Sequence, residues 1–187
     1  MNFMNPDFAY MLGNFMADGS FYFSGGSLRF EFVDGTPYKH ELSYSFKHIK
    51  NIKNILERNL KKELPQIRKK GNMFVLKFRN RILAKIFTND LYIAPGPKHL
   101  TVNIPKVFKN SPYEVYFWKG FLDGDGSIAR TSKRVAVESM SEAIISSFAE
   151  FLNKNKIYFS KYTTKRGDFF SHIVIIRSIS LRDFAQK

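Results

Sequence analysis

The 187-residue chain is 44% hydrophobic, so it can bury a core as one large domain or two small ones, and its twenty phenylalanines exclude a disordered chain. No apolar run reaches the roughly eighteen residues of a membrane span, and the lack of cysteine excludes disulfides, cysteine-based zinc sites and thiol nucleophiles. The formal charge of +14, from 30 basic and 16 acidic residues, favours nucleic acid as the partner over an acidic membrane surface, because the basic residues are spread over strands and turns.

Two predicted helices share one pattern. The first begins at Asn5 and Pro6, with asparagine as the N-cap, and reads YMLGNFMADGS over residues 10–20. The second begins at the capping-box sequence of residues 111–114 and reads FWKGFLDGDGS over 117–127. Each apolar segment passes through a central glycine into Asp-Gly-Ser, where glycine can end a helix.

The first motif is followed by alternating strand and helix signals. Residues 27–32 (SLRFEF) and 41–47 (ELSYSFK) alternate polar and apolar positions and predict two strands. A helix is predicted over 49–63, where apolar residues lie on one stripe. A hairpin with its tip at 68–72 (RKKGN) follows, and a last helix is predicted to begin near Asn80.

The same order of elements returns after the second motif. Short strands are predicted at 127–129 and 134–139, and a helix at 142–154. A hairpin with its tip at 164–168 (TKRGD) comes next, and a final helix begins near Ser180. The order helix, hairpin, helix, hairpin, helix therefore occurs twice.

This repeat predicts three parts of the chain. Residues 1–87 form the first half and residues 111–187 the second. Residues 88–110 contain three prolines and no helical period, and are interpreted as the linker. A duplicated α+β domain with no shared active site is the alternative interpretation of the repeat.

Small residues lie four positions apart on both motif helices. Gly13 and Ala17 do so on the first helix, and Gly120 and Gly124 on the second. Such a spacing lets two helix backbones approach closely. We therefore expect the two helices to pack against each other through these faces.

This packing would bring Asp18 and Asp125 side by side at the same end of the helix pair. Two carboxylates repel, and each would lie at the negative end of a helix dipole, so a divalent cation is expected between them. Oxygen ligands with water suit Mg²⁺. A calcium loop starting at Asp123 is excluded, because its sixth position is Ile128 and its twelfth is Arg134.

Residues 11–19 (MLGNFMADG) and 118–126 (WKGFLDGDG) resemble the two signatures of a single-chain LAGLIDADG homing endonuclease. The resemblance covers nearly the whole chain. It implies an α+β fold of two αββαββα repeats with pseudo-twofold symmetry, whose antiparallel sheets form a saddle over duplex DNA. It also implies an endonuclease that cuts both DNA strands and leaves short 3′ overhangs.

The resemblance also implies which residues hold the metal. The carboxylates of Asp18 and Asp125 would be ligands, together with the backbone carbonyls of Ala17 and Gly124. The first acidic position of the signature is Met16 here, a position that serves packing and capping more than metal binding. Mg²⁺ is the expected cofactor, with Mn²⁺ as a substitute and Ca²⁺ as an ion that binds without supporting cleavage.

The family places a basic or polar side chain near the end of the second strand of each repeat. With residues 41–47 as that strand, Lys47 takes this place as a catalytic residue, and its alternative role is a phosphate contact or a solvated helix start. The matching place in the second repeat, residues 138–140, has no lysine. The chain's histidines share no metal-ligand spacing and are interpreted as surface or structural residues: His40, His48, His99 and His172.

The polar faces of the predicted sheets should read DNA, with arginine and glutamate contacting bases and most lysines neutralising phosphates. For each of these residues, a solvated surface role is the alternative. The expected DNA-contacting residues are Ser27, Arg29, Glu31, Glu41, Ser43, Ser45, Lys47, Arg68, Lys70, Asn72, Lys77, Arg130, Arg134, Lys161, Thr163, Lys165 and Arg166.

The sequence therefore predicts a monomeric, site-specific, Mg²⁺-dependent DNA endonuclease that acts on double-stranded DNA and is encoded within an intron. We expect it inside the cell, in a prokaryotic cytoplasm or an organelle matrix. One alternative is an RNA-binding maturase for its own intron. The other is a DNA-binding regulator of the same fold that does not cleave. Retention of both Asp18 and Asp125 favours cleavage.

Overall fold

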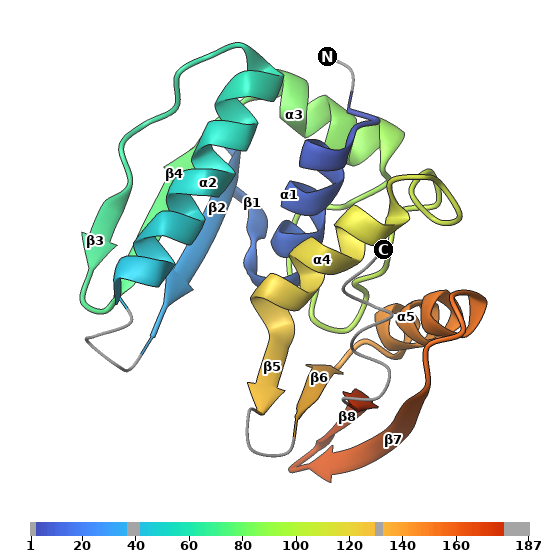
Figure 1. Cartoon of the computed structure of the whole chain (residues 1–187). Helices are drawn as coiled ribbons and strands as arrows, with labels where there is room; N and C mark the ends of the chain where they lie inside the picture. Colours follow the sequence, from blue (N-terminus) through green and yellow to red (C-terminus); the bar gives the residue numbers. More distant parts are fainter. Residues whose placement is uncertain (1–2, 37–41, 130–132, 178–187) are drawn as a thin grey trace.

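The computed structural model describes residues 3–36, 42–129 and 133–177 (Figure 1). Each half begins with a helix that ends in Asp-Gly. The elements of the first half are α1 (Pro6–Asp18), β1 (Ser20–Ser24), β2 (Ser27–Gly35), α2 (Leu42–Leu60), β3 (Arg68–Lys70), β4 (Met73–Phe78), α3 (Arg81–Lys85) and the π-helical turn η2 (Ile86–Asp90). Those of the second half are α4 (Glu114–Asp125), β5 (Gly126–Ala129), β6 (Arg134–Ser139), α5 (Glu142–Lys154), β7 (Phe159–Arg166) and β8 (Phe169–Arg177).

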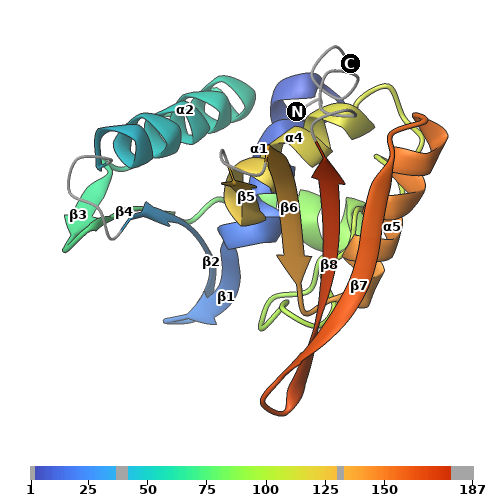
Figure 2. The same cartoon turned by 60° about the horizontal axis from the view of Figure 1, so that its bottom comes forward.

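The two halves build matching antiparallel sheets. The strand order is β1-β2-β4-β3 in the first sheet and β5-β6-β8-β7 in the second. The register is also repeated, since Phe32 on β2 lies opposite Leu76, and Val137 on β6 lies opposite Val174. α2 packs on one sheet and α5 on the other, while α1 and α4 lie together between them (Figures 1 and 2). The predicted α+β architecture of two repeats, each with a four-stranded antiparallel sheet, is confirmed. The final helix predicted to begin near Ser180 lies outside the described residues.

Aromatic side chains fill the space between helices and sheets. Phe15 on α1 lies edge-on to Phe32 and Phe87, with ring centroids 5.3 and 4.9 Å away. On the other side, Trp118 on α4 packs 4.9 Å from the Phe148 ring of α5. Full burial of one such side chain contributes roughly 1.5–3 kcal/mol, so each motif helix is fixed to its own half by its apolar face.

The prediction of a strand over residues 41–47 is wrong. Within the described part of this segment the chain is already helical, and the strand that forms a hairpin with β2 is β1, which comes before it. Ser45, Ile49 and Ile52 are all buried on α2, so its buried face begins one turn before the predicted helix. Alternation over so few residues fits both periods, and β1 follows the motif with no turn residue between them.

The second motif helix begins at Glu114, slightly later than predicted. Ser111 forms a turn instead, in which its Oγ accepts from Tyr113 N at 3.2 Å. Glu114 still reaches back, because its Oε2 accepts from Asn110 N at 2.7 Å and its Oε1 from Trp118 Nε1 at 3.3 Å. The buried glutamate thereby satisfies donors at the start of α4.

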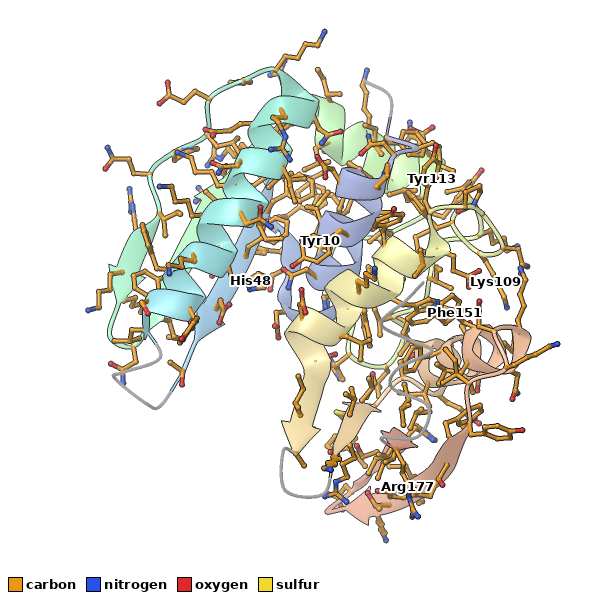
Figure 3. All side chains as sticks on the ribbon, viewed as in Figure 1. Tyr10, His48, Lys109, Tyr113, Phe151 and Arg177 are labelled. Carbon is orange, nitrogen blue, oxygen red and sulfur yellow. The ribbon has the colours of Figure 1, made fainter. Side chains whose placement is uncertain are left out.

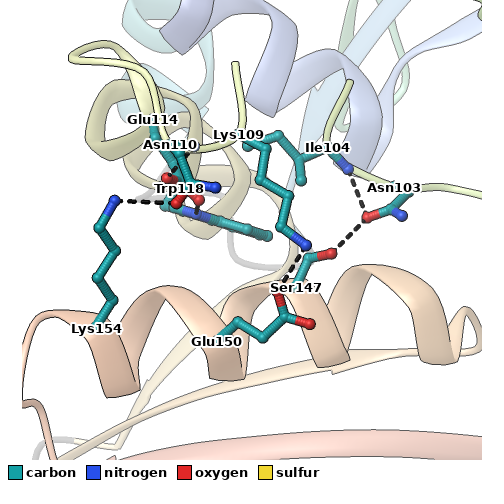
Figure 4. Close-up of polar contacts among 9 residues, drawn as sticks. All are labelled: Asn103, Ile104, Lys109, Asn110, Glu114, Trp118, Ser147, Glu150 and Lys154. Atoms are coloured by element: carbon teal, nitrogen blue, oxygen red, sulfur yellow. Dashed lines mark hydrogen bonds and ion pairs between the residues drawn. The ribbon is translucent and has the colours of Figure 1, made fainter. Parts of the chain in front are cut away.

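The later part of the segment between the halves, residues 102–110, is docked on the second half rather than extended in solvent (Figure 4). Ser147 Oγ on α5 donates to Asn103 Oδ1 at 2.9 Å, and Lys109 Nζ lies 2.6 Å from Glu150 Oε2. Its apolar side chains Val102, Ile104 and Phe108 are buried. In the described residues, no helix is long and apolar enough to cross a membrane.

Candidate active site at the helix pair

α1 and α4 approach until their backbones touch. A Cβ placed on Gly13 would lie 1.9 Å from the carbonyl oxygen of Phe117, and one on Gly120 would lie 1.9 Å from that of Tyr10. No side chain fits at either position, because real Cβ atoms do not come this close to a backbone atom. The predicted close packing of the two small-residue faces is therefore found.

The packing brings the two motif carboxylates together. Asp18 ends α1 and Asp125 ends α4, and a Cβ on Gly124 would lie 3.0 Å from Asp18 Oδ2. Burial raises the pKa of Asp125 to about 6, with the Asp18 carboxylate adding to the rise and Lys98 opposing it. Burial likewise raises the pKa of Asp18, against the opposing charge of Lys98. Both shifts show that two negative charges are held in a place that disfavours them.

This donor set fits a hard divalent cation. The carboxylates converge at the helix ends, where the backbone carbonyls of the last turn also point outward. Among the described residues, no group of three or more histidine, aspartate and glutamate side chains could hold a metal ion alone. An ion here would therefore need carbonyl oxygens, water or substrate oxygens to complete its coordination.

Lys98 from the linker also reaches this site. Its Nζ donates to Ala17 O at 2.7 Å and also to Met16 O, and it lies within electrostatic reach of both motif carboxylates. Burial lowers the pKa of Lys98 to about 8, while Asp125 and Asp18 favour its charged form. Sequence reasoning missed this residue, because a lysine between prolines in a linker carries no local signal of a site.

His48 on α2 is a second residue that sequence reasoning did not place at the site. Its Nδ1–H donates to Asp34 Oδ2 at 2.5 Å, and Asn14 Nδ2 on α1 lies 3.4 Å from its Nε2. The Asp34 carboxylate raises the pKa of His48, and the charges of Asp123 and Asp18 act in the same direction. Figure 3 shows His48 on the part of α2 that lies next to α1.

A hollow lies on each side of the helix pair. The one on the second-half side is lined by residues that include Lys98, Asp125 and Glu138. The one on the first-half side is lined by residues that include Asp18 and Asp34. Each motif carboxylate therefore faces its own open space, beside its own sheet.

Comparison with known proteins agrees with this geometry. The family model described as LAGLIDADG-like domain matches residues 112–187. The structure of I-DmoI in complex with DNA and Ca matches 97% of this chain and 86% of its own, with a TM-score of 0.67 and 20% identity. This chain has the LAGLIDADG homing endonuclease fold.

Other solved structures match as well. I-WcaI bound to its DNA recognition sequence covers 97% of this chain and 79% of its own, with a TM-score of 0.63 and 13% identity. Full-length DUF199/WhiA from Thermatoga maritima covers 100% of this chain but 56% of its own, with a TM-score of 0.59 and 15% identity. I-DmoI has also been crystallised with DNA and Mn, and its G20S variant with Mg. No curated protein matches the sequence significantly.

The predicted position of Lys47 at the end of the second strand is wrong, because Lys47 lies on helix α2. The second strand of the first half ends at Gly35, so the polar residue near its end is Asp34. Lys47 lies on α2 with an exposed side chain, and its Nζ is 5.9 Å from the centroid of the Tyr44 ring. In the second half the register opposite His172 puts Ser139 at the matching place.

The open face of the first LAGLIDADG sheet carries several predicted DNA-contacting residues. Glu31 and Lys77 lie opposite each other on β2 and β4, with 3.0 Å between Lys77 Nζ and Glu31 Oε2. Tyr22 OH donates to the same oxygen at 2.7 Å, and Arg29 lies opposite Tyr22. By alternation this face also carries Ser27, Arg68 and Lys70, with Asn72 in the turn between β3 and β4.

The second LAGLIDADG sheet divides the predicted residues between its two faces. Arg134 lies opposite Arg177 and alternates with buried Val137, which places it on the open face. Lys161 lies opposite buried Val174 and its Nζ donates to Ser146 Oγ on α5 at 2.9 Å, so it is on the helix side.

The remaining predicted residues fall in three groups. Thr163 and Lys165 alternate onto the same helix side of β7 as Lys161. On α2, Ser43 is exposed and Ser45 is buried, so the two are not part of a strand face. Glu41 and Arg130 lie outside the described residues, as does the side chain of Arg166.

Proposed function

We propose that this protein is a site-specific DNA endonuclease that hydrolyses both strands of its target with a divalent metal ion. The observation that carries the proposal is the meeting of Asp18 and Asp125 at the ends of two helices in backbone contact, between two sheets with open polar faces. A structural helix end gains nothing from two half-buried carboxylates held side by side, whereas a metal-dependent nuclease needs them.

The ligands we assign to the metal are Asp18, Asp125 and the carbonyl oxygens of Ala17 and Gly124. A divalent ion bound there would activate a water molecule and stabilise the leaving 3′ oxygen. Mg²⁺ is the proposed ion, Mn²⁺ a substitute, and Ca²⁺ an ion that binds without supporting cleavage. The protein's own residues orient the duplex, because its phosphates must lie across the open sheet faces to bring a strand to each carboxylate.

Binding would be shared between the halves. We propose that residues 1–87 and 111–187 each contact one half of the target, joined by residues 88–110. On the first sheet Arg29 and Lys77 would contact bases or phosphates, and on the second sheet Arg134 would do so. The +14 charge supplies the attraction to the duplex.

The test begins with a target selected from randomised duplex DNA by Ca²⁺-dependent binding. That target is placed in a supercoiled plasmid and incubated with Mg²⁺, Mn²⁺, Ca²⁺ or EDTA. We expect linear product with Mg²⁺ and Mn²⁺ only. Asp18→Asn or Asp125→Asn alone should abolish linear product while specific binding stays within about tenfold.

Asp123→Asn is the matched control, because Asp123 lies in the same motif but is exposed and accepts from Tyr10 OH at 2.6 Å. It should retain cleavage. Specific binding without cleavage under any metal would contradict the nuclease and favour the alternative of a DNA-binding regulator.

A further inference from the structure

The ammonium group of Lys98 lies at the end of α1, where negative charge accumulates. Its Nζ donates to the carbonyls of Met16 and Ala17, whose oxygens belong to the last turn of the helix. These carbonyls carry the negative end of the helix dipole. The carboxylates of Asp18 and Asp125 add their charges at the same place.

The chain on both sides of Lys98 is fixed to different halves of the molecule. Before it, Gly96 N donates to Phe21 O on β1 at 2.8 Å. After it, Val102 O accepts from the buried Ser141 Oγ at 2.7 Å, and Val102 N donates to Lys98 O at 2.9 Å. Lys98 is therefore held in place by the first sheet and by the start of α5, unlike a lysine on a free loop.

We propose that Lys98 is a built-in counter-ion, which holds the Asp18–Asp125 pair together without metal and competes with a divalent cation for the carbonyl of Ala17. This inference rests on the proposed metal site for the identity of the competing ion. A carbonyl oxygen that accepts from an ammonium is less available to a metal ion, and the two cations repel at such short range. Lys98 would thus weaken metal binding while stabilising the metal-free protein.

A purely structural role makes a different prediction. If Lys98 only fastened the linker to α1, its loss would destabilise the protein equally with and without the carboxylates. As a counter-ion, its effect must depend on Asp18 and Asp125, because their charges are what it neutralises. The two roles are therefore separated by a double-mutant cycle.

The experiment measures thermal unfolding and Ca²⁺ binding by calorimetry at pH 7 for Lys98→Met and Lys98→Gln. Met removes both the charge and the hydrogen bonds, while Gln keeps a donor for the Ala17 carbonyl. We expect both to tighten Ca²⁺ binding about tenfold and Met to lower the metal-free melting temperature by about 4 °C. Lys98→Arg should stay close to wild type in both measurements.

Lys106→Met is the matched control, because Lys106 is an exposed lysine of the same linker. It should change neither quantity. In an Asp18→Asn, Asp125→Asn background, Lys98→Met should no longer lower the melting temperature. If it lowers that temperature by the same amount there, and Ca²⁺ affinity is unchanged in both Lys98 variants, the counter-ion role is overturned. If Lys98→Met does not fold, Lys98→Gln decides by the same two measurements.

Failure of the metal site gives a different result. If the double asparagine variant binds Ca²⁺ as tightly as the wild type, the ion is not held by the carboxylates, and the competition half of the inference falls with the proposed function. The unfolding cycle uses no metal, so it still decides whether Lys98 neutralises the carboxylate pair.

Discussion

The hollows on the two sides of the α1–α4 pair differ in charge although they are built on the same backbone. On the first-half side the hollow is lined by the carboxyl-bearing Asp18, Asp34 and Asp123. On the second-half side Asp125 shares the hollow with the cation Lys98. The backbone contacts at Gly13 and Gly120 constrain both halves to the same helix packing. The polar groups around each carboxylate are not part of these contacts, so they can differ between the halves. The helix packing that both halves share is called the shared frame below, and the polar groups that differ around each carboxylate are called the divergent surroundings. The two can be tested separately.

The largest expected effect comes from breaking the shared frame. Gly13→Ala and Gly120→Ala each force a Cβ to within 1.9 Å of a backbone carbonyl on the partner helix. The helices must separate, which should cost roughly 3 kcal/mol in unfolding free energy and also lower cleavage. Urea unfolding measures the first effect, and plasmid linearisation the second.

Gly71→Asn serves as the control, because Gly71 has a φ of +60° that asparagine tolerates and a Cβ there meets nothing within 4 Å. It should change stability by no more than about 0.5 kcal/mol. If either helix variant were as stable as this control, the backbone contact would not be what joins the halves.

The shared frame is the part of the site that the sequence predicts well. Glycine spacing and the Asp-Gly helix ends are local patterns, and each has a direct steric meaning in the structure. The alternation predicted for residues 27–32 likewise appears in the structure, where Phe30 and Phe32 are both buried. Because the small-residue pattern occurs on both motif helices, the sequence also predicts that these two helices pack against each other.

The divergent surroundings could not be predicted in the same way. Lys98 reaches the site from a segment without periodicity, and its place depends on hydrogen bonds to both halves. The place of His48 was not predicted, because residues 41–47 were assigned to a strand and the start of the helix was therefore set too late. Side chains point in different directions in a strand and in a helix, so the wrong element gives the wrong neighbours. The contacts of both residues are long-range, and a single sequence shows no pattern for them.

The second prediction concerns the rate at which the DNA strand next to the first-half hollow is cleaved. His48 bonds to Asp34 and lies near Asp18, so it belongs to one side of the site. His48→Gln should therefore slow cleavage of one strand more than the other, by on the order of tenfold, and a nicked intermediate should accumulate. A supercoiled plasmid assay separates nicked from linear product in time.

His99→Gln is the matched variant on the other side, because His99 is an exposed residue that lines the second-half hollow. The His99→Gln variant should not accumulate the nicked intermediate that His48→Gln accumulates. Equal slowing of both strands by His48→Gln would show that the two sides of the site are not chemically separate.

A smaller effect is expected on stability as a function of pH. Because Asp34 raises the pKa of His48 above its usual 6.5, the folded protein binds this proton more tightly than the unfolded chain does. The pair should thus stabilise the fold fully below pH 6.5, and this stabilisation should be lost as pH rises through the folded-state pKa. The charges facing His48 are those of Asp34, Asp123 and Asp18.

The measurement is the difference in melting temperature between wild type and His48→Gln from pH 5.5 to pH 9. It should be largest at the acidic end and shrink towards the alkaline end. Asp34→Asn should remove the same pH-dependent part. A difference that grows with pH would have the wrong sign and would refute the His48–Asp34 ion pair.

The smallest effect is expected at Lys47, where the sequence pattern predicted a catalytic group. The side chain is exposed on α2, beside the Tyr44 ring, and contacts neither motif carboxylate nor either hollow. Lys47→Met should therefore weaken DNA binding by at most about threefold, through loss of one phosphate contact, and leave the ratio of nicked to linear product unchanged. Lys50→Met, one turn along α2 and also exposed, should behave alike. If Lys47→Met instead stops cleavage of one strand while Lys50→Met does not, Lys47 reaches the scissile phosphate when DNA is bound. The polar group that completes the first half of the site would then be Lys47 rather than the His48–Asp34 pair.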